Sequence, residues 1–337
     1  MTINLFISYR QVFLFGLERM NRMRWIDGHC DVLWKMWEAR EPISFYDADS
    51  PLDVRFPKAR AVGIGLQVFA LFVSPKMPKE AIWDAVLRQV DLFHEEIVRD
   101  GSEVAAIGSA AQLENLKDSG KMGALLSLEG ADALAGELYR LRVLHRLGVR
   151  QLGLTWNHAN EAADGVEEDR GGGLTRFGRT LVEEMTRLRM ILDVSHLSER
   201  GFWDVMEFSD VPVIASHSNC HAVCPHRRNL KDGQIRALVE KEGIMGIAFV
   251  PQFVHEPKEE AAVEHLFRHI DHVCELGGER ILAFGSDFDG ISHKIGGLED
   301  VGSLPYLEEQ LLKRYPEHWV RRWMWGNWYD FYRKHLP

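Results

Sequence analysis

The chain of 337 residues is 46% hydrophobic and carries a formal net charge of −10, from 40 basic and 50 acidic side chains. No Lys/Arg-rich run occurs in it, which argues against binding to nucleic acid or to an anionic membrane surface. Four cysteines are too few for a disulfide scaffold in a chain of this length, so we expect a reducing, cytoplasmic compartment.

The first 22 residues are predicted to form an N-terminal extension, disordered or loosely packed, ahead of a single domain over residues 23–337. Apolar side chains between Leu5 and Phe15 are interrupted by Arg10, and no basic leading segment or small-residue cleavage site accompanies them. The run is also too short to cross a bilayer, so no membrane anchor is expected there. A weak signal peptide stays open as the alternative.

Eight short apolar runs recur along the chain, and most precede a polar turn and a helical pattern. Their hydrophobicity is continuous rather than alternating, which is typical of parallel strands covered by helices on both faces. Apolar residues recur at helical spacing over Ile82–Ile97, Leu181–Leu188 and Val263–Val273. The predicted strands are Trp25–Asp31, Ala61–Leu71, Gly123–Gly130, Arg150–Asn157, Met190–Leu197, Val211–Ser218, Gly243–Pro251 and Ile281–Gly290.

Strands that alternate with helices fit either an α/β barrel or a doubly wound sheet. The count of eight favours the barrel, and the first predicted strand is not followed by the GxGxxG turn of a dinucleotide-binding sheet. Barrels of this length fold as one domain. We therefore predict a single-domain (β/α)8 TIM barrel with its functional site at the C-terminal ends of the strands.

Carboxylates or imidazoles close five of the predicted strands. His29 and Asp31 end the first strand, and strand alternation would turn both toward the same space. The other four strands end in Glu129, His196, His217, and the pair Asp287 and Asp289. Such groups are costly to bury unless they are paired or bound to a metal ion. The set suits two metal ions that share a bridging carboxylate.

In this order and spacing, the motifs resemble the membrane (renal) dipeptidase family, which comprises zinc peptidases on a metal-dependent-hydrolase barrel. The resemblance runs from about Trp25 to the region of Trp328. It rests on Asp27-Gly28-His29-Cys30-Asp31, Leu128-Glu129-Gly130, Gly173-Leu174-Thr175-Arg176-Phe177-Gly178, Leu192-Asp193-Val194-Ser195-His196, Ser216-His217-Ser218, Arg227-Arg228-Asn229, Gly285-Ser286-Asp287-Phe288-Asp289-Gly290 and Gly326-Asn327-Trp328.

The resemblance implies two Zn²⁺ ions held by five side chains, with another divalent metal as an alternative. His29 and Asp31 would bind one ion, and Glu129 would bridge to the second. His196 and His217 would complete the second site. A hydroxide that bridges the two ions would then hydrolyse small dipeptides with broad specificity, including dipeptides with a C-terminal D-residue.

Two further roles follow from the resemblance, and one family position differs. Asp287 matches the acid/base carboxylate, and Arg228 matches the arginine that holds the substrate's C-terminal carboxylate, a task suited to a bidentate guanidinium. Renal-type enzymes place a carbonyl-polarising histidine directly after Leu-Thr, where this chain has Trp156. His158 either takes over that catalytic role or lines the pocket, and Trp156 and Asn157 are predicted to contact substrate.

Two other departures from the family pattern are visible. Cys30 stands where the renal enzymes have Asn, and alternation should turn it away from the metal ions. The secretory and lipid-anchor signals of the mammalian enzymes are not found in this sequence.

Other functions remain open at this stage. The same site could hydrolyse another amide, such as an N-acyl amino acid or a lactam. A non-catalytic metal-binding homologue is the second alternative, favoured by Trp156 but opposed by retention of Asp287 beside every ligand. The sequence does not fix the oligomeric state, for which a homodimer is one candidate.

Overall fold

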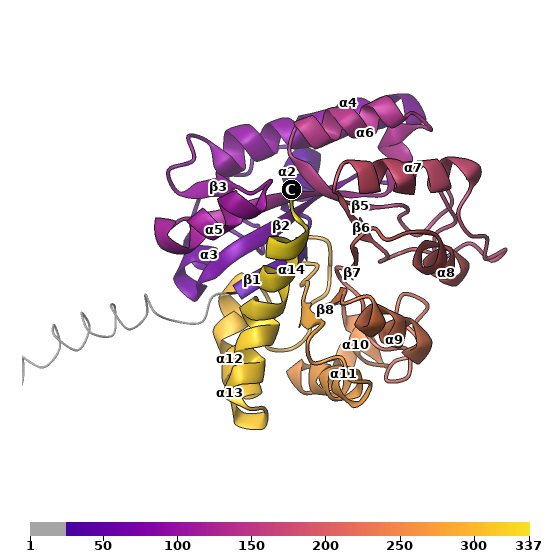
Figure 1. Cartoon of the computed structure of the whole chain (residues 1–337). Coiled ribbons are helices and arrows are strands. Elements are labelled where there is room, and N and C mark those ends of the chain that lie inside the picture. The colour runs from indigo at the N-terminus through magenta and orange to yellow at the C-terminus, as the bar shows by residue number, and fades with distance from the viewer. Residues whose placement is uncertain (1–24) are drawn as a thin grey trace, which may run out of the picture.

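Eight parallel strands form the centre of the molecule in the computed structural model, which describes residues 25–337 (Figure 1). Each strand pairs with the next in the order β1-β2-β4-β5-β6-β7-β8-β9. They are β1 (Trp25–Cys30), β2 (Ile64–Phe72), β4 (Met122–Glu129), β5 (Val149–Gly153), β6 (Ile191–Asp193), β7 (Val213–Ala215), β8 (Ile244–Ile247) and β9 (Leu282–Phe284). The predicted (β/α)8 TIM barrel is confirmed, whereas the extension predicted for residues 1–22 lies outside the described residues.

The barrel closes between β1 and β9 through isolated contacts rather than a continuous ladder. The backbone N–H of Asp31 donates to the carbonyl of Phe288 at 2.9 Å. Beside it, the Asp27 carboxylate accepts hydrogen bonds from the N–H and the hydroxyl of Ser286, each at 2.7 Å. A buried carboxylate thus holds the two edge strands together directly below the predicted ligands.

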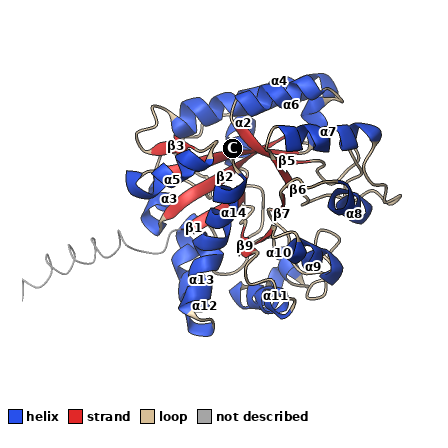
Figure 2. Ribbon diagram, viewed as in Figure 1, coloured by secondary structure: helices blue, strands red, loops and turns tan. Residues whose placement is uncertain are grey.

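Helices surround the strands (Figure 2). They are α2 (Val32–Glu38), α3 (Phe56–Val62), α4 (Lys79–Leu92), α5 (Ala110–Ser119), α6 (Leu138–Arg146), α7 (Arg176–Arg187), α8 (Glu199–Phe208), α9 (Asp232–Glu240), α10 (Pro251–Val254), α11 (Val263–Glu275), α12 (Leu304–Arg314), α13 (Glu317–Arg321) and α14 (Asn327–His335). The three predicted helical repeats fall in α4 with the π-helical segment Phe93–Val98 that follows it, in α7 and in α11. Within residues 25–337, no helix is both long enough and apolar enough to span a bilayer.

The predicted C-terminal ends of β5, β6, β7, β8 and β9 were wrong, and β5 in particular ends at Gly153 rather than at Asn157. The strands β6, β7 and β9 have three residues each and stop before the functional side chains begin. The chain bends sharply there, because His196 and Asp287 have φ angles of 68° and 64°, an uncommon conformation outside glycine. A further short strand, β3 (Val104–Ala106), pairs with β4 outside the barrel order and was not predicted.

The C-terminal helix α14 closes the N-terminal end of the barrel. Trp328 and Tyr332 are fully buried there among side chains that come from the strands on every side, such as Ile26 on β1 and Ile214 on β7. The indole N–H of Trp328 donates to the carbonyl of Phe284 at 2.9 Å. This end of the barrel is therefore an apolar core, which leaves the opposite end for polar chemistry.

Gly28 on β1 makes the close packing of α14 possible. A Cβ atom at this position would lie 2.3 Å from Cζ2 of Trp328, whose ring is fixed by its hydrogen bond to Phe284 and by stacking on Tyr332. We expect Gly28→Ala to lower the free energy of unfolding by about 1–3 kcal/mol through overpacking, as measured by denaturant titration. The control is Gly233→Ala on α9, whose Cβ would lie 3.6 Å from the nearest side chain. If Gly28→Ala and Gly233→Ala had the same free energy of unfolding, the close packing of Trp328 against Gly28 would be contradicted.

Candidate metal centre and pocket

The five predicted metal ligands meet at the C-terminal end of the barrel, although they come from four segments spread along the chain. His29 and Glu129 lie at the ends of β1 and β4, and Asp31 precedes α2. His196 and His217 lie in the loops after β6 and β7. Each of the five side chains is less than 10% exposed.

Glu129 lies between two groups of ligand atoms. Its Oε2 is 3.5 Å from Nε2 of His29, which is itself 3.5 Å from Oδ2 of Asp31. Its Oε1 is 2.8 Å from Nε2 of His196 and 3.7 Å from Nε2 of His217. Each carboxylate oxygen therefore faces a different pair of side chains, as a carboxylate that bridges two metal ions would.

Hydrogen bonds fix the histidine rings so that their Nε2 atoms point into this cluster. His196 donates from Nδ1 to Oδ1 of Asn157 at 2.6 Å. Nδ1 of His217 lies 2.7 Å from the hydroxyl of Ser216, which in turn donates to Asp193. With the proton on Nδ1 in both rings, the Nε2 lone pairs remain available to a metal ion.

Two features show that the donor set fits a metal ion. Nε2 of His29 is buried without a hydrogen-bond partner, and Nε2 of His196 and His217 lie only 2.8 Å apart. Among the described residues, two sets of three potential ligand atoms lie within 4.8 Å of one another, those of His29, Glu129 and His217 and those of His29, Asp31 and Asp287. Imidazole nitrogens with carboxylate oxygens are the ligands that Zn²⁺ takes in hydrolases.

The electrostatics of the cluster also favour a bound cation. Burial, together with neighbouring carboxylates, raises the pKa of both Glu129 and Asp287. Burial lowers the pKa of His196 and of His217 well below the usual value, with smaller contributions from Arg228 and His29. Burial thus makes ionised carboxylates and protonated imidazoles both unfavourable here. A divalent cation would relieve this cost, because it stabilises ionised carboxylates and neutral imidazoles together.

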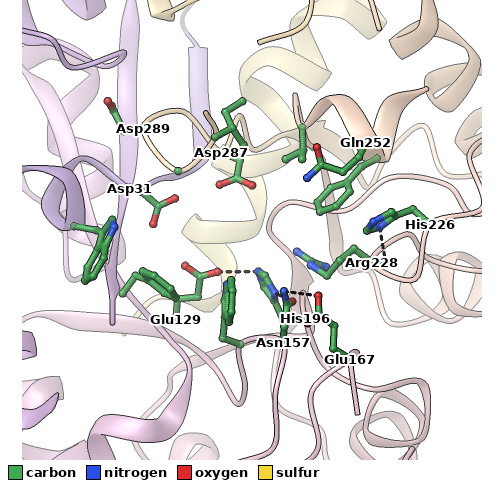
Figure 3. Close-up of a pocket in the computed structure, with 17 residues that line it drawn as sticks. Asp31, Glu129, Asn157, Glu167, His196, His226, Arg228, Gln252, Asp287 and Asp289 are labelled. Carbon is green, nitrogen blue, oxygen red and sulfur yellow. Dashed lines mark hydrogen bonds and ion pairs between the residues drawn. The ribbon is translucent and has the colours of Figure 1, made fainter. Parts of the chain in front are cut away.

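A pocket of about 300 Å³ opens beside the cluster (Figure 3). Arg228 lies across it from Asp31 and is 4% exposed. Its Nη2 donates to the carbonyl of His217 at 3.3 Å, its Nε is buried without a partner, and the guanidinium lies 5.2 Å from the ring centre of Phe253. Burial lowers the pKa of Arg228 to about 10, where the group is still cationic at neutral pH. This is a suitable place for an anionic group of a ligand.

The three residues Trp156, Asn157 and His158, which follow β5, differ in whether they line the pocket. Trp156 lines the pocket, with its ring centre 5.8 Å from that of His196. Asn157 also lines the pocket, but its side chain is engaged by His196 and donates to Glu167 at 3.1 Å. His158 is 51% exposed at its side chain, lies 3.8 Å from Glu167, and is not among the residues that line the pocket.

Several residues of this pocket were not predicted. Glu167 belongs to a polar, glycine-rich stretch that looks solvent-exposed in the sequence, yet it lines the pocket and orients Asn157. Trp34 and Phe72 line it as well, and their sequence pattern is that of core residues.

Asp289, predicted as one of the charged strand ends, accepts hydrogen bonds from the backbone N–H groups of Asp53 and Val54 and from Lys35. It therefore anchors the loop that precedes α3.

Comparison with known proteins gives consistent matches over nearly the whole chain. The family described as membrane dipeptidase (peptidase family M19) matches residues 17–334. Dipeptidase aclJ of Aspergillus oryzae is 34% identical over 312 residues, which are 88% of this chain and 74% of that protein. The crystal structure of dipeptidase AC, a metallopeptidase of family M19, is 30% identical with a TM-score of 0.86 and covers 93% of this chain and 99% of its own.

A second solved structure carries a ligand. It is a metallopeptidase from Rhodobacter sphaeroides, liganded with a phosphinate mimic of the dipeptide L-Ala-D-Ala. It is 29% identical to this chain, has a TM-score of 0.86, and covers 94% of this chain and 99% of its own.

The contact between Asn157 and His196 predicts an effect on metal binding. We expect Asn157→Ala to weaken metal affinity about 10- to 100-fold, because His196 loses the acceptor that fixes its ring and tautomer. Competition with a chromophoric chelator measures the affinity. Asn115→Ala, at an exposed position on α5, is the matched control. Unchanged affinity in Asn157→Ala would show that this hydrogen bond does not support the metal site.

Proposed function

The chain belongs to the membrane dipeptidase family, peptidase family M19, and on that premise we propose how its site binds and cleaves a dipeptide. The protein is a metal-dependent dipeptidase. We propose two Zn²⁺ ions as the cofactor, with another divalent metal as the alternative. The observation that carries this proposal is the position of Glu129, whose two oxygens face two separate ligand pairs.

The ligands divide into two sets on this proposal. His29 and Asp31 would hold one ion together with Oε2 of Glu129, and His196 and His217 would hold the other together with Oε1. When bound, the two ions would supply a hydroxide at neutral pH and polarise the scissile carbonyl. The remaining steps depend on side chains of this chain.

Asp287 is proposed to move the proton. It is partly buried at the start of the loop after β9, and one of its oxygens lies within 4.8 Å of ligand atoms of both His29 and Asp31. As a carboxylate it can accept the proton of the attacking water and then donate it to the departing amine. Both transfers take place at one carboxyl group, so no second acid is needed.

Arg228 is proposed to hold the C-terminal carboxylate of the substrate. Its buried Nε–H lacks a partner, and the guanidinium lies across the pocket from Asp31, with Asp287 between them (Figure 3). A carboxylate bound there would place the adjoining peptide bond over the ligand cluster, so that the residue carrying the carboxylate directly follows the scissile bond. This arrangement would limit the enzyme to dipeptides.

The pocket wall supports two further assignments. Trp156 and Asn157 would shape the pocket beside His196, whereas His158, outside the lining, is assigned no part in the reaction. Acceptance of a C-terminal D-residue is proposed because a neighbour of closely similar fold holds a mimic of L-Ala-D-Ala.

Metal analysis with a substrate panel tests the proposed function. We expect two equivalents of zinc per chain, cleavage of L-Ala-L-Ala and L-Ala-D-Ala, and no cleavage of tri-alanine. A chelator should abolish the activity, and added zinc should restore it. Activity that persists without metal would refute the mechanism. Cleavage of N-acetyl-alanine in preference to every dipeptide would favour the alternative amide hydrolase.

Removal of the guanidinium tests the role of Arg228. We expect Arg228→Ala to raise KM for L-Ala-L-Ala about 10- to 100-fold, because the substrate carboxylate loses one hydrogen-bonded charge pair. Both metal ions should stay bound. Arg227→Ala, at the neighbouring position with a 53% exposed side chain, is the control and should leave KM unchanged. An unaltered KM in Arg228→Ala would exclude the proposed carboxylate contact.

A further inference from the structure

Three aromatic side chains form a continuous wall on one side of the pocket, here called the aromatic wall. Trp34 lies on α2, Phe72 ends β2, and Trp156 follows β5. The ring centres of Trp34 and Phe72 are 5.2 Å apart, and those of Phe72 and Trp156 are 5.4 Å apart. All three rings are only half-buried and line the pocket, so part of each face remains free to contact a ligand.

The aromatic wall and Arg228 lie on opposite sides of the metal ligands. The residues of the aromatic wall come from the side of the barrel formed by β1, β2 and β5, whereas Arg228 follows β7 and Phe253 follows β8. Figure 3 shows Asp31 and Glu129 on one side and Arg228 and His226 on the other, with Asp287 between them. Trp34 is three residues beyond Asp31 on the helix that this aspartate begins.

This placement decides where each half of a dipeptide would lie, if the proposed function holds. Only the Cα and N atoms of the C-terminal residue separate its carboxylate from the scissile carbonyl. The C-terminal residue would therefore extend from Arg228 to the ligand cluster around Glu129. The N-terminal residue must continue beyond the cluster, on the side of the aromatic wall.

We propose that the aromatic wall makes this enzyme select dipeptides whose N-terminal residue carries an aromatic side chain. Aromatic rings gain free energy by packing edge-to-face or offset against one another, beyond the gain from burying the same apolar area. The adjacent rings of Trp34 and Phe72 are already set at 78°, so an entering ring can meet an edge and a face together. An alanine side chain would leave these faces in contact with water.

A comparison of dipeptides tests the selection on the zinc-loaded full chain. We expect kcat/KM for L-Phe-L-Ala to exceed that for L-Ala-L-Ala about tenfold or more, with L-Leu-L-Ala between them. L-Ala-L-Phe should be no better than L-Ala-L-Ala. A preference for L-Ala-L-Phe, or equal values for all four, would overturn the proposal while leaving the dipeptidase function intact. Failure to cleave any of the four would instead refute the proposed function.

Variants of the wall separate selection from general damage. Trp34→Leu and Phe72→Leu keep an apolar side chain but remove a ring, and neither residue is a proposed metal ligand. Each should reduce the ratio of kcat/KM for L-Phe-L-Ala over L-Ala-L-Ala at least threefold, with zinc content unchanged. Phe208→Leu, at an exposed position on α8, is the control and should keep the ratio. Equal losses for both substrates would show that the wall is only structural.

Discussion

The site depends on one constraint, which is the close packing of three carboxylates and three imidazoles, all buried except the partly buried Asp287, in a single small volume. Glu129 is at the centre of this group, and each of its oxygens faces a different pair of neighbours. Water cannot reach these groups well enough to stabilise their charges, so the apoprotein can only shift their protonation. Divalent cations between the carboxylate oxygens and ring nitrogens would satisfy the same groups without protonating the acids or charging the rings.

The barrel supports this cluster by keeping its two ends different. At the N-terminal end, Trp328 and Tyr332 fill the interior with apolar packing that leaves no room for a side chain at Gly28. At the other end, β1 and β4 carry His29 and Glu129, whereas the loops after the short strands β6 and β7 carry His196 and His217. Hydrogen bonds that the two histidine rings donate to Asn157 and Ser216 then fix the orientation of these rings. The packed N-terminal end therefore positions the strands, and the strand ends and loops at the opposite end position the polar side chains of the site.

The fold and the ligand cluster could be predicted from sequence because both follow from local patterns. Continuous apolar runs identify the parallel strands, and a buried charge at the end of such a run, as in Glu129, needs a partner. The bends at His196 and Asp287 could not be predicted, because no glycine marks these left-handed positions. Side-chain contacts within an irregular loop, such as that of Glu167 with Asn157, leave no periodic signal either. Trp34, an aromatic residue on an amphipathic helix, has the sequence pattern of an ordinary core residue.

Anomalous X-ray diffraction at the zinc absorption edge, from crystals of the zinc-loaded protein, tests whether metal ions bind on both sides of Glu129. We expect two peaks, one among His29, Asp31 and Oε2 of Glu129, and one among His196, His217 and Oε1. A single peak, or two peaks that do not share Glu129, would contradict the bridging carboxylate on which this interpretation of the site rests.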